Sequence, residues 1–162
     1  MKRRLGEDVE ETAMRAVVQR VDSARVDADG VHAGSIGKGM VAFVGFRSSD
    51  GMKEFGYMAD KLLGLRIFED ENGKMNLSVL QSGGGVLLIP NFTLYGDARK
   101  GRRPDFMASS ASSVAAKQFE EFCTCFRGLF PMLETGVFRT EMKVEVHNDG
   151  PVTILLDSER IF

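Results

Sequence analysis

Tight-turn signals at both ends of the chain, set between short apolar segments, constrain its fold most strongly. Near the start, Asp29-Gly30 stands between two alternating segments, residues 25–28 and 31–36, and supplies the left-handed positions of a hairpin turn. Near the end, the sequence HNDGP separates residues 141–146 from residues 152–157 in the same manner. The sequence therefore predicts a sheet that begins and ends in hairpins.

The middle of the chain adds further strands and two amphipathic helices. A flexible turn is predicted at the triple glycine, residues 83–85. Apolar residues recur at helical spacing over residues 52–63, which predicts the first helix. The remaining strand-like segments are residues 14–21, 40–46, 65–70 and 86–89. A second helix is expected after a Ser112 N-cap, with an apolar face formed by Val114, Phe119, Phe122, Cys123 and Phe126.

Two helices among many strands indicate one α/β domain, a sandwich of mixed sheet with its helices on one face. At 162 residues, 43% of them hydrophobic, the chain is long enough to bury one core. We expect this domain to span residues 14–162 and residues 1–13 to form a flexible polar extension. The helical content is too small for a doubly wound nucleotide-binding fold.

Composition excludes several classes of protein. The formal net charge of -2 argues against general electrostatic adhesion to nucleic acid or to an anionic membrane, so any RNA contact must be local. No apolar run reaches transmembrane length, and the acidic residues within residues 1–12 argue against a secretory signal or a transit peptide. Cys123 and Cys125 have no histidine nearby, so neither a zinc site nor a disulfide framework is predicted. A reduced, cytoplasmic setting without a membrane partner follows.

The stretch PNFTLYGDARKGRRPDF, residues 90–106, has features that a packed core does not need. Pro90 ends the strand before it because proline lacks the N–H that a ladder requires, and residues 91–94 then form a strand end or tight turn with accessible backbone. Tyr95 and Phe106 are expected to offer stacking surfaces beside a cluster of four cations: Arg99, Lys100, Arg102 and Arg103. Such a cluster suits either a solvated face or a phosphate contact, and both interpretations stay open.

No catalytic triad is predicted. Thr93 is a candidate nucleophile, but the sequence around it offers only Asp97 as a nearby carboxylate and no His or Lys base of the usual kind. We therefore interpret Thr93 as a hydrogen-bonding residue. His32 and His147 each stand beside a predicted hairpin turn and are interpreted as ordinary surface residues.

Five segments, MRAVVQRV, LRIFEDENGKMNLSVL, NFTLYGDARKGRRPDF, TGVF and MKVEVHNDGPVTILLDS, together closely resemble the D-aminoacyl-tRNA deacylases. The resemblance covers residues 14–158. It implies the three-layer α/β sandwich of that family. It also implies a homodimer with each active site at the subunit interface. It also implies hydrolysis of the ester that joins a D-amino acid to the terminal adenosine of tRNA, with no metal, no cofactor and no covalent intermediate.

The first family motif, at the catalytic strand end, usually reads Ser-Gln-x-Thr, and its Thr falls on Thr93. Pro90 and Asn91 replace the first two residues, so a hydroxyl and a backbone donor are lost and the amide is shorter by one methylene. Asn91 would therefore orient the terminal ribose less firmly than the usual Gln. The backbone N–H groups of Phe92 and Thr93 survive these changes and are our candidates for stabilising the oxyanion.

The second family motif, Asn-x-Gly-Pro-Val-Thr, is intact and begins at Asn148. The resemblance implies that its Gly150-Pro151 peptide is cis, enters the partner subunit's site, holds the substrate amino group and excludes an L side chain. Arg20 falls on the arginine that braces this motif in the family. Arg139 and Thr140 replace the usual Gly-Ala and are expected to narrow the pocket for the adenosine.

Two alternative functions remain open. Pro90 resembles a related animal deacylase that removes L-alanine mischarged on threonine tRNA, so one alternative is a deacylase of this fold that acts on Gly- or L-Ala-tRNA. Some eukaryotic relatives are associated with DNA replication origins, so the other is a catalytically silent nucleic-acid-binding protein. The intact second motif favours the D-specific enzyme, because the resemblance places the chirality filter there.

Overall fold

The computed structural model describes residues 13–162. The extension predicted for residues 1–13 lies outside this range except for Ala13, which is buried. The elements in chain order are β1 (Arg15–Ala28), β2 (Val31–Ile36), β3 (Gly39–Gly45), α1 (Met52–Gly64), β4 (Phe68–Glu69), β5 (Met75–Leu77), α2 (Val79–Ser82), β6 (Gly85–Pro90), the 3-10 turn η1 (Phe92–Tyr95), α3 (Ser112–Leu129), β7 (Glu134–Thr135) and β8 (Met142–Asp157).

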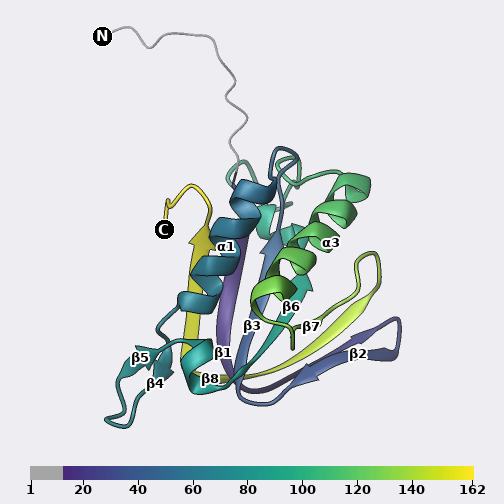
Figure 1. Cartoon of the computed structure of the whole chain (residues 1–162). Helices are drawn as coiled ribbons and strands as arrows, with labels where there is room; N and C mark the ends of the chain where they lie inside the picture. The colour runs from purple at the N-terminus through teal and green to yellow at the C-terminus, as the bar shows by residue number, and fades with distance from the viewer. Residues whose placement is uncertain (1–12) are drawn as a thin grey trace, which may run out of the picture.

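A mixed sheet organises the domain (Figure 1). Its strand order is β2-β1-β3-β6-β7, and β8 pairs with β1. β1 runs antiparallel to β2, β3 and β8, whereas β6 is parallel to β3 and to β7. The carboxyl ends of β3 and β6 therefore meet at one edge of the sheet, which is where ligand sites often form in open α/β sheets.

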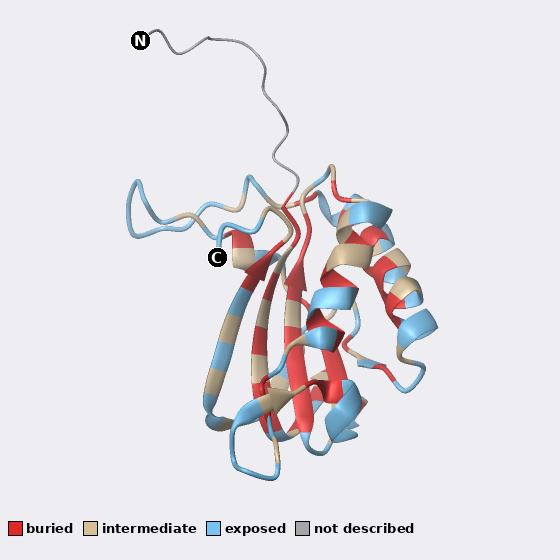
Figure 2. Cartoon of the chain, turned by 60° about the vertical axis from the view of Figure 1, so that its left-hand side comes forward, coloured by how far each residue is buried: buried red, intermediate tan, exposed pale blue. Residues whose placement is uncertain are grey.

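The two long helices cover one face of this sheet (Figure 1). Phe55 of α1 and Phe122 of α3 meet with ring centroids 6.0 Å apart, and both rings pack against Phe46 at the end of β3. Under the helices, Ala16 and Val18 of β1 belong to the same core, and Figure 2 shows the strands here as buried. The prediction of helices on one face is confirmed.

A second, smaller core lies on the other face. β1 changes partner along its length, because residues 15–21 pair with β3 and residues 24–28 pair with β2. The half formed by β2 and the adjoining parts of β1 and β8 folds over the sheet, so that Val26 and Val144 pack with Leu87 of β6. The helices, the main sheet and this folded half make three layers, as the resemblance implied.

β8 is one continuous strand of 16 residues, so the C-terminal hairpin predicted around HNDGP is wrong. β8 pairs with β1 from Arg15 opposite Asp157 to Ala28 opposite Met142. Between these ends Gln19 lies opposite Thr153 but Val21 lies opposite Asn148, so residues 149–152 face the single residue Arg20. We call residues 149–152 the bulge. The glycine and proline that suggested a turn instead allow the strand to bulge and continue.

Local predictions were also wrong at α3 and at β4. Ala111, not Ser112, is the N-cap of α3, and Val114 is exposed because the buried stripe of the helix begins at Ala115. Of the predicted strand over residues 65–70, only Phe68–Glu69 pairs.

The triple glycine is a turn, but its role is close packing. Gly83 caps the short helix α2 in the left-handed conformation, with φ of 73°. Gly85 lies against the start of β3, where a Cβ on Gly39 would fall 2.0 Å from the Gly85 carbonyl oxygen. These glycines therefore let β3 and β6 begin side by side.

Candidate active site

The chain turns sharply at the carboxyl end of β6. Asn91 continues the parallel ladder by donating its N–H to the Val44 carbonyl at 2.7 Å, and Phe92–Tyr95 then form η1 with Asn91 as the N-cap. We call residues 91–95 the site turn. Phe92 and Thr93 are exposed on it, so the predicted turn with accessible backbone is confirmed.

The Asn91 side chain is folded back onto Thr93. Its Oδ1 accepts the Thr93 N–H at 3.2 Å and also contacts the Thr93 hydroxyl, which must be the donor because an amide oxygen can only accept. An amide oxygen is not a base, so this contact supports Thr93 as a hydrogen-bonding residue rather than a nucleophile. It also occupies the Thr93 N–H, which was one of the two free donors that we expected.

The back of the site turn is held by two residues that the sequence did not mark as functional. Tyr95 is 1% exposed, and its Oη contacts the carbonyls of Gly45, at 3.0 Å, and Ala13. Arg15 Nη1 donates to the Leu94 carbonyl at 3.2 Å, and its guanidinium carbon lies 4.9 Å from the centroid of the Tyr95 ring. Burial raises the pKa of Tyr95, so the phenol stays protonated. Tyr95 is an anchor, and its predicted role as a stacking surface is wrong.

Phe92 and Phe106 form an aromatic pair beside Thr93. Phe92 is 54% exposed, and its ring meets that of Phe106 edge to face with centroids 5.2 Å apart. Phe106 reaches this position because Asp97 and Asp105 exchange two backbone hydrogen bonds, of 2.8 and 3.0 Å, which close the intervening residues into a loop. We call residues 98–104 the basic loop.

The basic loop displays all four predicted cations at the surface. Arg99 is already paired, since its Nη2 lies 2.6 Å from Asp97 Oδ2, and its hydrogen bonds lower the pKa of Asp97 to about 2. Lys100, Arg102 and Arg103 make no ion pair with any other residue in the part of the chain that the structure describes. Three cations are thus available for a phosphate, whereas Arg99 shapes the loop.

Asn148, at the start of the second motif, closes the bulge of β8. Its Nδ2 donates to the carbonyls of Arg20, at 3.0 Å, and Val152, at 2.9 Å. The Gly150-Pro151 peptide within the bulge is cis, and both residues are exposed. The motif is therefore a fixed protrusion on an edge of the sheet.

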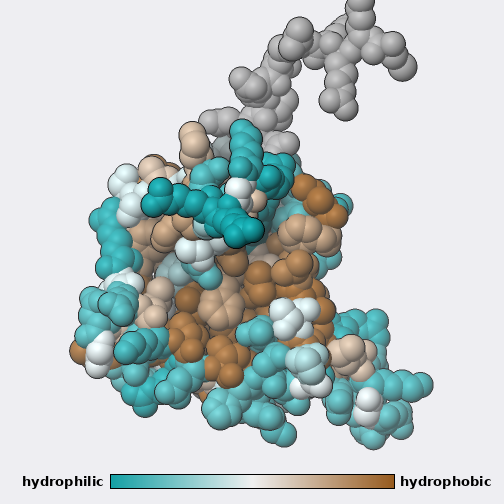
Figure 3. All heavy atoms as spheres, turned by 180° about the vertical axis from the view of Figure 1, so that it is seen from behind, coloured by the Kyte–Doolittle hydropathy of each residue, from teal (hydrophilic) through white to brown (hydrophobic). Residues whose placement is uncertain are grey.

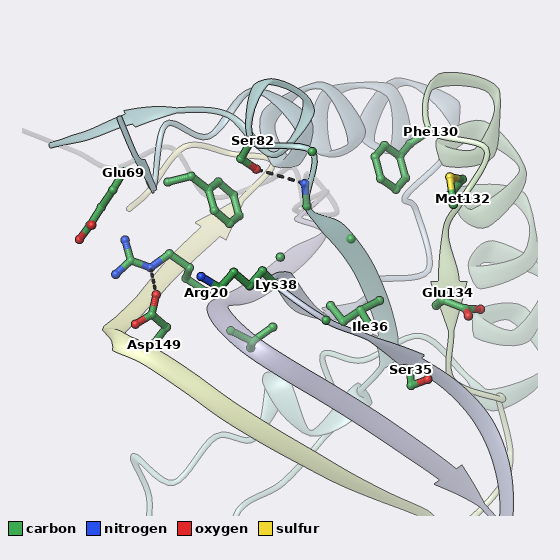
Figure 4. A pocket seen from close by; sticks show the side chains of 17 residues that line it. Arg20, Ser35, Ile36, Lys38, Glu69, Ser82, Phe130, Met132, Glu134 and Asp149 are labelled. Atoms are coloured by element: carbon green, nitrogen blue, oxygen red, sulfur yellow. Dashed lines mark hydrogen bonds and ion pairs between the residues drawn. The ribbon is translucent and has the colours of Figure 1, made fainter. Parts of the chain in front are cut away.

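Arg20 supports the bulge from beneath, although it is a charged residue only 6% exposed. Its Nη1 donates to the Ile67 carbonyl at 2.8 Å, and its Nε lies 3.1 Å from Asp149 Oδ2 (Figure 4). Gly150 has φ of 124°, and a Cβ there would fall 2.8 Å from Val152 Cγ2 and 3.2 Å from Arg20 Nη2. A side chain at residue 150 would thus strain the backbone and displace the bulge.

Within one chain the two motifs lie at opposite ends of the sheet. Val21 pairs with Gly39 beside the bulge, whereas Arg15 pairs with Gly45 beside Asn91. From Gly39 to Gly45 the strand advances six residues, which at about 3.3 Å each is about 20 Å. A single chain therefore does not bring the Thr93 and Gly150 regions together.

A cavity of 670 Å³ lies at the end of the sheet that carries the bulge (Figure 4). Its lining includes Arg20 and Asp149, Lys38 between β2 and β3, and Phe130 after α3. None of the residues of the site turn lines it. The candidate catalytic residues of the site turn therefore lie outside this cavity.

Pro90 packs toward the segment that follows β7. A Cβ on Gly136 would lie 3.3 Å from Pro90 Cδ, so the two backbones are close. Arg139 adopts φ of 62°, which is uncommon for a residue with a side chain, and its Nε donates to Ser112 Oγ at 3.1 Å. The guanidinium of Arg139 is thus directed toward the start of α3, and its effect on an adenosine pocket stays a prediction.

These features define a three-layer α/β protein. Its candidate site lies on a turn at the carboxyl end of a parallel strand pair, and a fixed bulge lies at the opposite end of the sheet. The family profile described as D-Tyr-tRNA(Tyr) deacylase matches residues 17–157. The chain belongs to this deacylase family, which confirms the resemblance.

Several relatives match the chain over almost its whole length. The D-aminoacyl-tRNA deacylases of Fervidobacterium nodosum, Clostridium botulinum and Anaeromyxobacter dehalogenans are 49%, 50% and 51% identical to it over 149 residues, which is 92% of this chain and 100% of each relative.

Solved structures confirm the fold. The structure titled c-Myc DNA Unwinding Element Binding Protein has a TM-score of 0.83 and 36% identity over 88% of this chain and 97% of that one. A probable eukaryotic D-amino acid tRNA deacylase has a TM-score of 0.75 and 19% identity over 90% of this chain and 99% of that one. In residues 13–162, no helix is both long and apolar enough to cross a membrane.

Proposed function

We propose that this protein hydrolyses the ester bond of D-aminoacyl-tRNA and releases the free D-amino acid and tRNA. One observation carries the proposal: a chain of this family presents both an exposed hydrogen-bonding turn at Thr93 and a fixed cis Gly150-Pro151 bulge. The bacterial relatives at about 50% identity bear the name of this activity. The protein is then a hydrolase that acts on a carboxylic ester and proofreads chirality in translation.

The proposed site needs a second copy of the chain, because one chain holds its two motifs about 20 Å apart. In an isologous homodimer, the Gly150-Pro151 bulge of each chain meets the site turn of the other. The sheet face away from the helices suits such a contact. Leu155, Val17 and Phe43 lie in one row across β8, β1 and β3, and Leu155 is 52% exposed. Figure 3 shows apolar side chains gathered on the face seen from behind.

Hydrolysis here depends on position rather than on a nucleophilic side chain, because an aminoacyl ester is already reactive. The oxygen of a water bonds to the carbonyl carbon, the bond to the ribose oxygen breaks, and one proton of the water passes to that ribose oxygen. The Phe92 N–H donates to no other residue within the described range, so it is free to stabilise the oxyanion. Thr93 Oγ, whose proton is directed at Asn91, accepts a hydrogen bond from the water or from the substrate.

Selection for the D-amino acid is assigned to the bulge. The carbonyls around Gly150 and Pro151 would hold the substrate amino group, and their fixed position would leave no room for an L side chain. Arg20 and Asn148 keep the bulge in place through their hydrogen bonds to Ile67, Val152 and the β1 backbone.

The basic loop is assigned to the acceptor end of tRNA. Lys100, Arg102 and Arg103 are its available cations, and Arg99 contributes through its pair with Asp97. The exposed ring of Phe92 offers a stacking surface for a base near these cations. The cytoplasm, where aminoacyl-tRNA is used, is the compartment that this function requires.

A second candidate function is nucleic-acid binding without catalysis. The observation that favours it is the 36% identity to the structure titled c-Myc DNA Unwinding Element Binding Protein. Such a protein would use the same basic loop and would leave aminoacyl esters intact. Because Pro90 replaces the usual Ser, a deacylase that acts on Gly- or L-Ala-tRNA is a further alternative.

A panel of four substrates tests these functions. The purified protein is incubated with D-Tyr-, L-Tyr-, Gly- and L-Ala-tRNA at equal concentration, and the intact ester is followed over time. The proposal predicts that the D-Tyr ester is lost and that the L-Tyr ester persists. Loss of the L-Ala ester alone would indicate the altered specificity, whereas tRNA binding with all four esters intact would indicate the silent protein.

A further inference from the structure

The orientation of the Asn91 amide follows from the hydrogen bonds that it makes. A backbone N–H can only donate, so the atom that faces the Thr93 N–H at 3.2 Å must be the amide oxygen. The Thr93 hydroxyl donates to the same oxygen. The Asn91 Nδ2, which is the other terminal atom of the planar amide, therefore points away from the Thr93 N–H.

Two donors remain without a partner on the site turn. Among the described residues, Asn91 Nδ2 donates no hydrogen bond, although the side chain is half-buried and held by two contacts at its oxygen. The Phe92 N–H, on the next residue, is also unused within this range. Asn91 Nδ2 is open to solvent and Phe92 is 54% exposed, so a water or a ligand oxygen can reach both donors.

We infer that Asn91 is a catalytic residue whose Nδ2 donates, together with the Phe92 N–H, to the oxyanion that forms on the ester carbonyl. This inference rests on the proposed function and assigns to the side-chain amide the place that we had expected for the Thr93 N–H. As water bonds to the carbonyl carbon, the negative charge grows on the carbonyl oxygen. Donors fixed before the reaction stabilise that charge without reorganisation.

The anchors behind the site turn favour this role. Tyr95 and Arg15 fix the last two residues of the turn to Gly45 and to the start of β1, and the Asn91 N–H fixes its first residue to β3. The donors therefore stand on a segment held at both ends. The Asn91 side chain is shorter than the usual Gln and reaches less far, but it folds back and makes two contacts with Thr93 through its oxygen.

Two variants separate hydrogen-bond donation by Asn91 Nδ2 from the contacts that Asn91 Oδ1 makes with Thr93. Asn91→Asp keeps an oxygen for both Thr93 contacts but loses the Nδ2 donors. Asn91→Ser keeps an acceptor for the Thr93 N–H and adds no charge. In single-turnover hydrolysis of D-Tyr-tRNA we expect each variant to lower the rate constant by about 10²–10³-fold. The matched control is Asn72→Asp, the same change on an exposed turn between β4 and β5, and it should leave the rate unchanged.

Binding and stability show whether the loss is catalytic. A non-hydrolysable amide analogue of D-Tyr-adenosine should bind both variants within about threefold of the unaltered protein, and their melting temperatures should stay close to it. Single-turnover rates within about threefold of the unaltered protein would overturn the inference while the proposed function stands. A loss confined to analogue binding would also overturn it, since Asn91 would then orient the substrate. If the unaltered protein leaves D-Tyr-tRNA intact, the proposed function itself fails, and the inference with it.

Discussion

The Tyr95 side chain packs directly on the backbone of Gly45, and its Oη lies 3.0 Å from the Gly45 carbonyl oxygen. A Cβ on Gly45 would fall 2.8 Å from Tyr95 Cε2. This contact joins the end of β3 to the turn that carries Asn91 and Thr93. The position of the site turn is therefore set by core packing, before any substrate binds.

Replacing Gly45 with alanine tests this anchor. Gly45→Ala forces the buried Tyr95 ring to move, so we expect a loss of about 1–3 kcal/mol in unfolding free energy and a further fall in deacylation rate of about tenfold or more. Thermal melting and single-turnover hydrolysis measure the two effects. The control is Gly128→Ala in α3, where a Cβ meets nothing within 4 Å and should be neutral or stabilising. A Gly45→Ala protein with normal activity would show that the anchor does not position the turn.

Neutralising two cations of the basic loop should weaken the binding of every tRNA alike. With Lys100→Gln and Arg102→Gln combined, the slope of log affinity against log salt should decrease by about 2, because each phosphate contact contributes about 0.9 on duplex nucleic acid. The control pair is Lys53→Gln with Lys74→Gln, both exposed on other surfaces. Equal slopes for the two double variants would exclude the basic loop from the tRNA contact.

Asp50 should make folding stability depend on pH. Burial, opposed by the Arg47 N–H, raises its pKa from 3.8 to about 6. The folded state thus holds this proton more tightly than the unfolded chain, and the resulting stabilisation is complete below about pH 4 and lost as pH rises through about 6. We expect the unfolding free energy of Asp50→Asn to be close to that of the unaltered protein at pH 4.5. At pH 8 it should be higher, by at most about 3 kcal/mol. The prediction would be contradicted if the difference in stability between Asp50→Asn and the unaltered protein became less favourable to the variant from pH 4.5 to pH 8.

A charge on the apolar sheet face should prevent dimerisation. Leu155 is 52% exposed in one chain, so Leu155→Asp should fold but should give a monomer by light scattering at micromolar concentration, without deacylase activity. Leu80→Asp is the matched control, because Leu80 is 56% exposed on α2. A Leu155→Asp protein that stays dimeric and active would place the interface elsewhere.

Periodicity predicted the strands and helices whose signals are local, but not the pairings between distant segments. The Asp29-Gly30 hairpin and α1 were found because turn chemistry and helical spacing lie within a few residues. The predicted C-terminal hairpin was wrong because Gly150-Pro151 suggests a turn locally, whereas β8 is held by β1 through contacts such as Asn148 with Arg20, 128 residues apart.

The candidate site was predictable to a similar degree. Thr93 and Gly150 came from motif positions that the chain keeps, and Asn91 came from a motif position where the family usually has Gln. The anchors could not be predicted, because Tyr95 reaches Gly45 across 50 residues and Arg15 reaches Leu94 across 79. The fold of Asn91 onto Thr93 is local, and an Asn two residues before an N–H is a known turn signal. That signal was available in the sequence, and it would have shown that the Thr93 N–H is occupied.

The central claim is that each active site takes its turn from one chain and its bulge from another, and mixed dimers test it most directly. Phe92→Pro removes a donor at the first position of η1, where proline is tolerated, and Gly150→Ala places a Cβ 2.8 Å from Val152 Cγ2. Each variant alone should be nearly inactive. Purified mixed dimers of the two, made with different affinity tags, contain one site with both halves intact. We predict that they hydrolyse D-Tyr-tRNA at about half the rate of the unaltered dimer and leave L-Tyr-tRNA intact. Mixed dimers as inactive as either parent, beside an active unaltered protein, would contradict the account.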